Sequence, residues 1–332
     1  EEMQARSMIL RAFTRGYTTM YQPRVELNDL SVVDRMTLDQ MAFNTYQPNN
    51  GEGAVGDIVN AWRSNAIRPV LRNKCISIAA HATARLIFPR VIALNEQEEH
   101  EEDLAEVMQD LIEWSAEQSD YNAYTMSRVI SALTDPASIG YTEYAESWRD
   151  VKYPNESGGY DKKTILDEAI SGFVNIPVTC DELFIENFYE PEIQKQEFLI
   201  WRRVISYGQA EAKYSKYVDT WQYVKPGILT LFSDANATFY QKYDNQMRDT
   251  DVEEVIYWNR RLDLKLVMCN GVLITSPDTP NPRLDKLYPF DKFGYELINN
   301  RCFYYKSLAF KLAPDANIVN TLYPMLIDAT YL

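Results

Sequence analysis

The stretch KLVMCNGVLIT, residues 265–275, is the clearest structural signal in the sequence. Two apolar runs, 266–268 and 272–274, flank the dipeptide Asn270-Gly271. Asn-Gly is the preferred pair for a two-residue type I′ turn, because both central positions of that turn need a positive φ. The stretch therefore predicts an antiparallel β-hairpin that turns at residues 270–271, within a β-rich region.

Other strand-like runs precede this hairpin. The longest is FLIWRRVISY, residues 198–207, in which Arg202 and Arg203 interrupt an otherwise apolar run. Val252–Trp258 reads as a second long strand. Shorter strands are expected at 144–150, 176–178 and 183–185.

Between these runs the sequence predicts loops and one short helix. Residues 152–163 are polar and contain Pro154, Gly158 and Gly159, which is typical of an exposed loop. Ser206 and Gln209 fit a capping box, so we expect a short helix over residues 210–217. Residues 221–251 are aromatic and irregular.

The first third of the chain is predicted to be mainly helical. The strongest pattern is Leu104, Val107, Met108 and Leu111, which recur at i, i+3, i+4 and i+7. Acidic residues in the first turn of this helix suit the positive end of the helix dipole. The other helices are expected at 34–41, from about 57 to 88 with an interruption at Pro69, at about 122–133, and from about Pro314 to the end.

Composition limits the class of protein. The chain has 332 residues, 46% hydrophobic and 24% charged, which excludes a wholly disordered chain. The formal net charge of −15 argues against broad binding to nucleic acid phosphates, which needs an excess of Lys and Arg. No run of about 18 uncharged apolar residues is present, so we expect no membrane partner. Both ends look cut, so we expect a piece of a longer protein.

Cysteine and histidine are few. The four cysteines, Cys75, Cys180, Cys269 and Cys302, form no C-x-x-C pair, and His81 and His100 are the only histidines. Because a zinc site needs closely spaced Cys and His ligands, we expect no metal site. We interpret the cysteines as reduced and mostly buried thiols.

Motifs that carry chemistry are weak. Residues 51–56 match G-x-G-x-x-G, but no strand precedes them and no acidic residue follows about twenty positions later, so we interpret them as a loop. The acids of 98–103 are expected to form a solvated helix start, and Glu253 and Glu254 to lie on opposite faces of a strand. We expect no catalytic residues and no cofactor.

Two further features have plain interpretations. His81 lies among Ile78, Ala79, Ala80 and Ala82, and we interpret it as a satisfied core or interface histidine. The nearest thing to a basic patch is Arg68, Arg72, Lys74 and Arg85. Surface ion pairs are the ordinary interpretation of this patch, and phosphate contact is the sharper alternative.

A series of segments, taken in order, resembles the portal proteins of tailed bacteriophages, the head-to-tail connector family. None of these segments is catalytic, and their order and spacing over most of residues 60–332 carry the resemblance. The segments are 68–74 (RPVLRNK), the helix that follows as far as Pro89, the acidic helix 98–114, 180–187 (CDELFIEN), 198–214, 255–259 (VIYWN), 270–273 (NGVL), 288–290, 295–296 and 303–308 (FYYKSL).

The resemblance implies a portal-like α+β fold in three regions. Residues 1–140 would form a helical wing, 141–260 a β-rich part of the wing near the stem, and 261–332 the hairpin and a closing helix at the start of the clip or stem. It implies a non-enzymatic subunit of a ring, a dodecamer in that family, at one vertex of the virion, assembled in the host cytoplasm. Double-stranded DNA would pass through the ring without sequence recognition. Terminase, the capsid and head-completion or tail proteins would dock on it.

The charge is consistent with a conduit, since a basic lining would bind the phosphates of DNA tightly and an acidic one would not. Two alternatives stay open. One is another virion structural protein that lacks an axial channel. The other is a hydrolase that uses paired carboxylates, which would need a cleft with perturbed titration.

Overall fold

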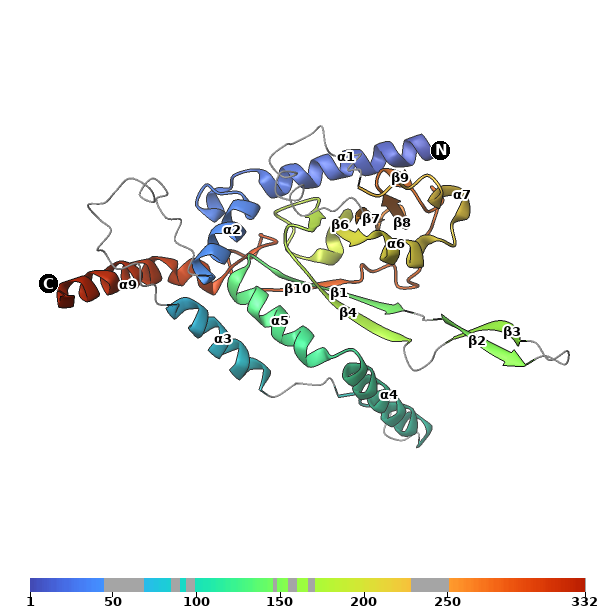
Figure 1. The fold of residues 1–332 in the computed structure, drawn as a ribbon, viewed down its shortest axis with the longest axis horizontal. Coiled ribbons are helices and arrows are strands. Elements are labelled where there is room, and N and C mark those ends of the chain that lie inside the picture. Colours follow the sequence, from blue (N-terminus) through green and yellow to red (C-terminus); the bar gives the residue numbers. More distant parts are fainter. Residues whose placement is uncertain are drawn as a thin grey trace.

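Five antiparallel strands form the central sheet of the molecule, in the order β5-β6-β7-β8-β9 (Figure 1). The structure, a computed structural model, describes residues 1–44, 69–84, 90–93, 99–145, 148–154, 160–166, 171–227 and 251–331. The strands are β5 (Leu183–Ile185), β6 (Phe198–Ser206), β7 (Asp251–Asn259), β8 (Leu264–Cys269) and β9 (Val272–Leu273). Helices surround this sheet, which confirms the predicted α+β class.

The β8–β9 hairpin confirms the prediction from the Asn-Gly pair. Asn270 has φ 43° and Gly271 has φ 82°, so both lie in the left-handed region that a type I′ turn needs. The Asn270 side chain also fixes the turn. Its Oδ1 accepts a hydrogen bond of 2.7 Å from the Glu253 backbone N–H, and its Nδ2 donates one of 2.6 Å to the Lys225 carbonyl. The turn is thereby tied to β7.

A second antiparallel sheet covers one face of the central sheet. Its order is β10-β1-β4. Tyr141 of β1 packs 4.6 Å from the Trp201 ring, and Phe290 of β10 packs edge-on to Trp258 at 5.0 Å. These aromatic rings fill the space between the two sheets and hold them together. The strands are β10 (Phe290–Phe293), β1 (Ser138–Ala145) and β4 (Gly172–Val178).

Helix α1 (Glu2–Tyr21) covers the opposite face of the central sheet. Its Phe13 ring lies 4.7 Å from the ring of Phe184 in β5. Leu183 pairs with Trp201, so Phe184 points to the other side of the sheet from that tryptophan. At Gly16 an added Cβ would lie only 2.9 Å from Phe184 Cβ, so glycine permits this close approach.

A layer of helices packs beside the two sheets. Its small core brings together Leu71, Cys75, Ala79, Leu133, Leu308 and Ala309. The helices confirm the predicted ones at 34–41 and 122–133, although 57–68 lies outside the described residues. The helices are α2 (Val32–Phe43), α3 (Val70–Thr83), α5 (Tyr121–Thr134) and the first turns of α9 (Leu308–Tyr331), with α4 (Glu99–Gln118) extending beyond α5.

Arg128 of α5 joins the helical layer to the second sheet. Its buried guanidinium donates to Ser138 Oγ at 2.7 Å, to the Tyr124 hydroxyl at 2.6 Å and to Asp291 Oδ2 at 2.9 Å. Gly140 lies directly beneath it, and a Cβ there would collide with the guanidinium. One arginine thus holds α5, β1 and β10 in fixed positions.

Two expectations for the middle of the chain are wrong. The predicted strand at 144–150 is divided between the end of β1 and the start of β2 (Trp148–Pro154). The predicted loop at 152–163 contains most of an antiparallel ribbon of β2 and β3 (Tyr160–Leu166), with only 155–159 outside the described residues. The polar composition predicted a loop, but it does not prevent the backbone pairing of these two strands.

Two helix starts also differ from expectation. The capping box of Ser206 and Gln209 is confirmed, but α6 (Tyr207–Tyr214) begins directly after Ser206 instead of at residue 210. The closing helix α9 begins at Leu308 and contains Pro314. Ser307 Oγ accepts a hydrogen bond of 2.9 Å from Phe310 N, so this serine caps and starts the helix before the proline.

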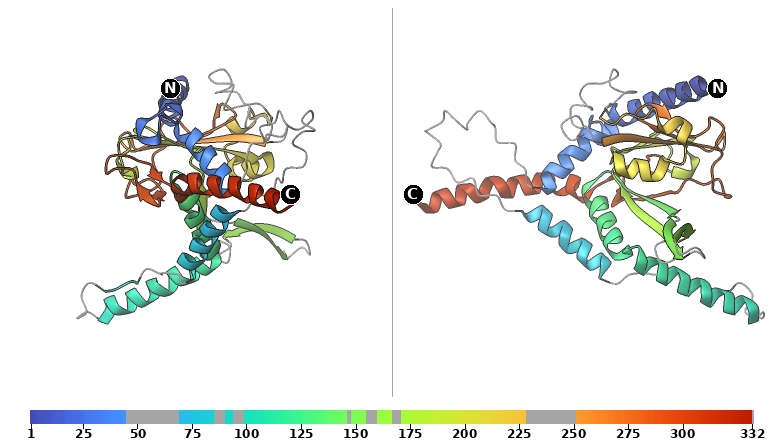
Figure 2. Two further views of the ribbon diagram at one scale, coloured as in Figure 1. Left: turned by 90° about the vertical axis from the view of Figure 1, so that its left-hand side faces the viewer. Right: turned by 45° about the vertical axis from the view of Figure 1, so that its right-hand side comes forward.

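Three segments extend away from the packed body of the molecule. Figure 1 shows α9, α4 and the β2–β3 ribbon leading outwards in different directions, and Figure 2 shows the same for α9 and α4 from two other sides. The remaining described elements lie near the sheets. They are η1 (Val25–Leu27), η4 (Ile193–Lys195), α7 (Val218–Trp221), β11 (Glu296–Leu297) and β12 (Tyr305–Lys306).

Candidate functional site

A network of charges around the buried Glu254 carboxylate lies between the central sheet and α6. The β6–β7 register places Arg203 opposite Glu254, and their side chains form an ion pair. Lys213 of α6 adds a second cation, with Nζ 3.0 Å from Glu254 Oε1, and the Tyr214 hydroxyl donates to the same carboxylate. A single buried carboxylate therefore links two strands to a helix.

The electrostatics of this network keep Glu254 ionised. Burial alone would raise its pKa, but the charges of Lys213 and Arg203, with hydrogen bonds from Arg203 and Tyr214, bring the pKa below the ordinary value. Burial and the neighbouring Glu254 raise the pKa of Tyr214. At neutral pH the carboxylate is thus charged and the phenol neutral.

A cavity of about 510 Å³ opens beside this network. Glu143 of β1 lies in its wall, where it accepts a hydrogen bond from Tyr141 and forms an ion pair of 3.1 Å with Lys265 of β8. The lysine Nζ lies 5.7 Å from the centroid of the Trp258 ring. The rest of the wall is formed by Thr142, Tyr144, Phe173, Asn281, Pro282, Arg283, Leu284, Asp285 and Pro289.

Near neutral pH, Glu143 and Tyr141 in the wall of this cavity each stay in one protonation state. Burial works to raise the pKa of Glu143, but Lys265 and Tyr141 outweigh it, and the pKa is lowered. Burial raises the pKa of Tyr141. Since general acid–base catalysis is most effective when a pKa lies near the working pH, Glu143 is poorly suited to donate a proton there. The wall can instead present two carboxylates, those of Glu143 and Asp285, and several aromatic rings.

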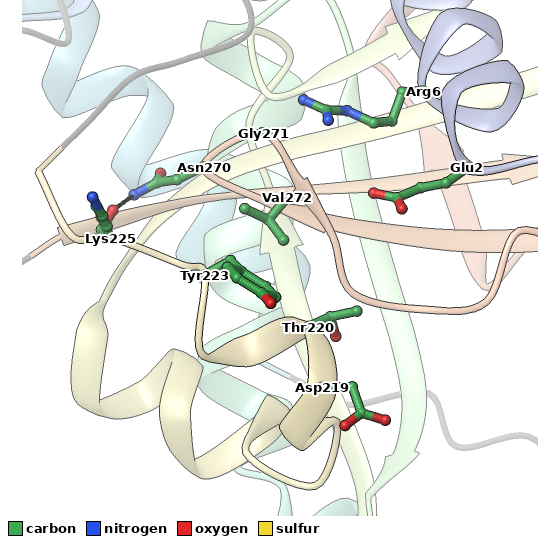
Figure 3. A pocket seen from close by; sticks show the side chains of 9 residues that line it. All are labelled: Glu2, Arg6, Asp219, Thr220, Tyr223, Lys225, Asn270, Gly271 and Val272. Carbon is green, nitrogen blue, oxygen red and sulfur yellow. Dashed lines mark hydrogen bonds between the residues drawn. The ribbon is translucent and has the colours of Figure 1, made fainter.

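A second cavity, also of about 510 Å³, lies beside the Asn270-Gly271 turn (Figure 3). Glu2 and Arg6 of α1 approach it from one side, and Asp219 and Thr220 of α7 from the other. Two acidic and two basic side chains line it, so its formal net charge favours neither an anion nor a cation. The remaining lining residues are Tyr223, Lys225, Asn270, Gly271 and Val272.

A second ion pair lies on the face of the central sheet that α1 covers. Arg202 pairs with Glu253, and the two side chains are only 3% and 2% exposed. Glu253 and Glu254 therefore point to opposite faces of β7, as predicted. The prediction missed their arginine partners. The sequence contains a signal for this pairing, because Arg202-Arg203 interrupts one apolar strand and Glu253-Glu254 interrupts the other.

Lys292 of β10 is a half-buried lysine whose pKa is lowered. Its Nζ donates to the Phe303 carbonyl and lies 4.0 Å from the centroid of the Phe303 ring. Burial lowers the pKa of Lys292 to about 8. The residue lines neither of the two cavities.

Large apolar surfaces on the outside of α4 and α9 form a third candidate. On α4, Val107 is 64% exposed, and on α9, Leu326 is 65% exposed. The other exposed apolar side chains are Leu104, Met108, Leu111 and Trp114 on α4, and Ile318, Val319, Leu322 and Met325 on α9. Contiguous apolar surface of this kind marks interaction sites on soluble proteins.

The residues that the sequence singled out are mostly on the surface. His81 is exposed on α3, where its Nδ1 lies 2.7 Å from the Ser77 carbonyl, so of the two predicted roles that of a core histidine is wrong and that of an interface histidine stays a prediction. Its neighbours in the sequence are small, but they face different sides of the helix. Arg72 and Lys74 are exposed on α3, and the Arg72 guanidinium lies 5.7 Å from the Phe43 ring.

Several of these residues lie outside the described part of the chain. They are Gly51–Gly56, Arg68, Arg85 and Glu98. The four cysteines are described, and all are free thiols and buried, as predicted. Among the residues that the structure describes, no three His, Cys, Asp or Glu side chains gather closely enough to hold a metal ion. None of the described helices is both long and apolar enough to cross a membrane.

No model of a known protein family matches the sequence, and no curated protein is significantly similar to it.

Proposed function

We propose that this chain is a subunit of a portal ring, the DNA channel at one vertex of a bacteriophage capsid. In this role it would act without catalysis, as one of about a dozen copies in the virion. Terminase would dock on the ring during packaging, and head-completion or tail proteins afterwards. The order of the portal-like segments between residues 68 and 308 supports this proposal.

The observation that carries the proposal is the exposed apolar surface on the extending helices. In a monomer, the side chains of Val107 and Leu326 stay exposed to water. Burying them in a contact would contribute about 25 cal/mol per Å² of apolar area removed from water. Both side chains lie on helices that extend from the body of the molecule, where a neighbouring copy can reach them. Repeated contacts between different surfaces of identical subunits generate rings.

Charge adds a second argument. The net charge of −15 makes the chain repel DNA instead of adhering to it. Double-stranded DNA carries about one negative charge per 1.7 Å of its axis, so a passage must avoid strong cationic contacts. Because charges beyond about 10 Å are screened at ordinary ionic strength, only those near the channel would act on DNA directly.

Light scattering and electron-microscope averages of the purified protein test the proposal. We expect particles of ring-sized mass whose averaged views show a central hole. A stable monomer at every salt concentration would contradict it. Ring-sized particles without a hole would favour the alternative of a virion structural protein that lacks a channel.

A further inference from the structure

Strand β1 has an open edge beyond Thr142. Strand β10 pairs with β1 as far as Tyr141, and the Thr142 N–H then donates a last bond of 3.0 Å to the Pro289 carbonyl. The chain before Pro289 leaves this line, because the Tyr288 N–H donates to Gln194 Oε1 at 2.9 Å. In the part of the chain that the structure describes, no strand pairs with β1 beyond Thr142 on this side.

The backbone groups of Tyr144 point to this open edge. In a paired strand, the N–H and C=O groups of residues two positions apart point to the same edge, so those of Tyr144 follow the N–H of Thr142. Pro177 of β4 has no N–H and lies opposite Gly140, which fits even-numbered residues of β1 that bond away from β4. Tyr144 thus offers one donor and one acceptor to a further strand, and such unpaired groups are a template for another chain.

The cavity that Glu143 lines lies along this edge and gathers exposed apolar side chains. Tyr144 and Phe173 are opposite each other on β1 and β4, both are exposed, and their ring centroids lie 5.6 Å apart. Leu284, in another wall of the same cavity, is 101% exposed, the largest value among the large apolar side chains that the structure describes. A segment lying beside Tyr144 could remove apolar surface of all three side chains from water, which is favourable.

The charges of this cavity determine the chemistry of such a segment. Four charged side chains line the cavity as two ion pairs, Glu143 with Lys265 at 3.1 Å and Arg283 with Asp285 at 2.7 Å. Each charge is matched within the chain, so a charged side chain brought into the cavity would lose its water without gaining a counter-charge of its own. The segment that fits is therefore uncharged, with a bulky apolar side chain on the side of Tyr144.

We propose that an uncharged, extended segment of another protein adds to the second sheet as a strand beside Tyr144, in line with β10. Backbone hydrogen bonds supply affinity in this mode of binding, and pockets for alternate side chains supply specificity. Residues 281–285 form another wall of the cavity, which suits a single extended segment better than the edge of a second folded sheet. The proposal goes beyond the portal ring and does not depend on its assembly.

A random library of displayed twelve-residue peptides, selected on the purified full chain, supplies the probe. We expect the enriched sequences to be uncharged and to alternate bulky apolar with polar residues, because successive side chains of a strand face opposite sides. Labelled synthetic copies of these peptides should bind the original protein in fluorescence anisotropy. If no sequence is enriched, or if the enriched sequences are highly charged, the proposal is overturned.

A pair of variants at Tyr144 tests the backbone pairing. Tyr144→Pro and Tyr144→Val both remove the aromatic ring, but only proline removes the N–H that points to the open edge. The β1–β4 ladder does not use this N–H, so circular dichroism of both variants should match the original protein. We expect the selected peptides to bind the proline variant about five-fold more weakly than the valine variant, as one lost hydrogen bond implies. Equal affinities would overturn the proposal.

A second pair of variants tests the place of binding. Leu284→Ser should weaken peptide binding roughly ten-fold, because the leucine side chain would no longer be buried by the peptide. Leu262→Ser is the matched control, since Leu262 is also exposed but does not line the cavity, and it should bind the peptides normally. If both variants bind like the original protein, the peptides bind elsewhere and the proposal is wrong.

The same peptides distinguish another protein from a second copy of this chain. If dilute monomers bind the peptides and ring-sized particles release them, a second copy occupies the edge, and the proposal is wrong while the ring stands. If the original protein binds the peptides as expected but stays a monomer at every salt concentration, the ring is wrong while the strand site stands.

Discussion

The two adjacent glutamates of β7 show how single side chains fix the central sheet. Glu253 faces Arg202 beneath α1, and Glu254 faces Arg203 on the side of α6. A buried ion pair does not by itself show a stabilising role, because the free-energy cost of removing two charges from water offsets much of their attraction. Removing one partner is different, since the other charge then stays buried without its match.

Replacement of Glu253 by Gln should therefore destabilise the protein. The variant keeps the size of the side chain but removes the carboxylate that Arg202 faces, and we expect the free energy of unfolding to fall by about 3 kcal/mol or more. Urea denaturation followed by circular dichroism measures the change. Glu192→Gln, which removes a carboxylate from an exposed pair with Lys195, should unfold like the original protein. Equal stabilities for both variants would contradict this expectation.

Glu254 predicts a pH dependence of stability. Its pKa in the folded protein lies below the ordinary value of 4.5, so the unfolded state binds more protons as the pH falls. The contribution to stability is complete above pH 4.5 and is lost as the pH decreases through the folded-state pKa. Denaturation between pH 7 and pH 3 should show stability decreasing at the acid end. The decrease should be smaller in Glu254→Gln, and an identical slope in that variant would refute this role.

At the level of elements, local chemistry predicted the strands and turns whose residues have one dominant preference. Asn270-Gly271 permits the left-handed φ at both turn positions, and the apolar runs of β6 and β7 have no other way to be buried. The β2–β3 ribbon differs from the predicted loop because the polar residues of 152–163 suggest solvent exposure and say nothing of the backbone ladder. The start of α9 also differs from the prediction, because Pro314 suggests a first helical turn whereas Ser307 caps the helix before it.

The hairpin turn should be sensitive to loss of its glycine. In Gly271→Ala, the new Cβ opposes the φ of 82°, and we expect a loss of about 1–2 kcal/mol in unfolding free energy. Gly208→Ala is the matched control. Gly208 lies in the first turn of α6, and a Cβ there meets nothing within 4 Å, so this variant should gain about 0.5 kcal/mol. A similar loss in both variants would show that the turn geometry is not responsible.

At the level of the whole molecule, the sequence could not predict which surfaces remain uncovered. The periodicity of Leu104, Val107 and Leu111 correctly predicts a helix with an apolar stripe. That stripe would normally indicate the side facing the core, but here it is exposed. Only the tertiary arrangement reveals this, because α4 uses Ile112 and Ser115 for its contacts. The cavity at Glu143 was hidden for the same reason, since Lys265 reaches it from 122 positions away in the sequence.

The extending helix α9 provides the last test of how the molecule assembles. Asp39 and Arg35 of α2 hold its base, since Ser307 Oγ donates to Asp39 at 2.7 Å and the Arg35 guanidinium lies 3.7 Å from the Phe310 ring. Beyond this base, Leu322 and Leu326 are exposed and contribute nothing to the core of the body. Their replacement should therefore leave the fold intact and affect only contacts between copies.

We expect Leu322→Glu with Leu326→Glu to melt at the temperature of the original protein and to need roughly ten-fold more protein for assembly, since two charges would have to be buried in the contact. Asn317→Glu with Thr321→Glu adds the same charge to exposed polar positions one step around the same helix, and it should assemble normally. Thermal melting and light scattering of both variants separate the outcomes. If the leucine variant assembles as the polar control does, the apolar face of α9 lies outside the ring contacts. A lowered melting temperature would instead mean that this face packs on the chain's own core.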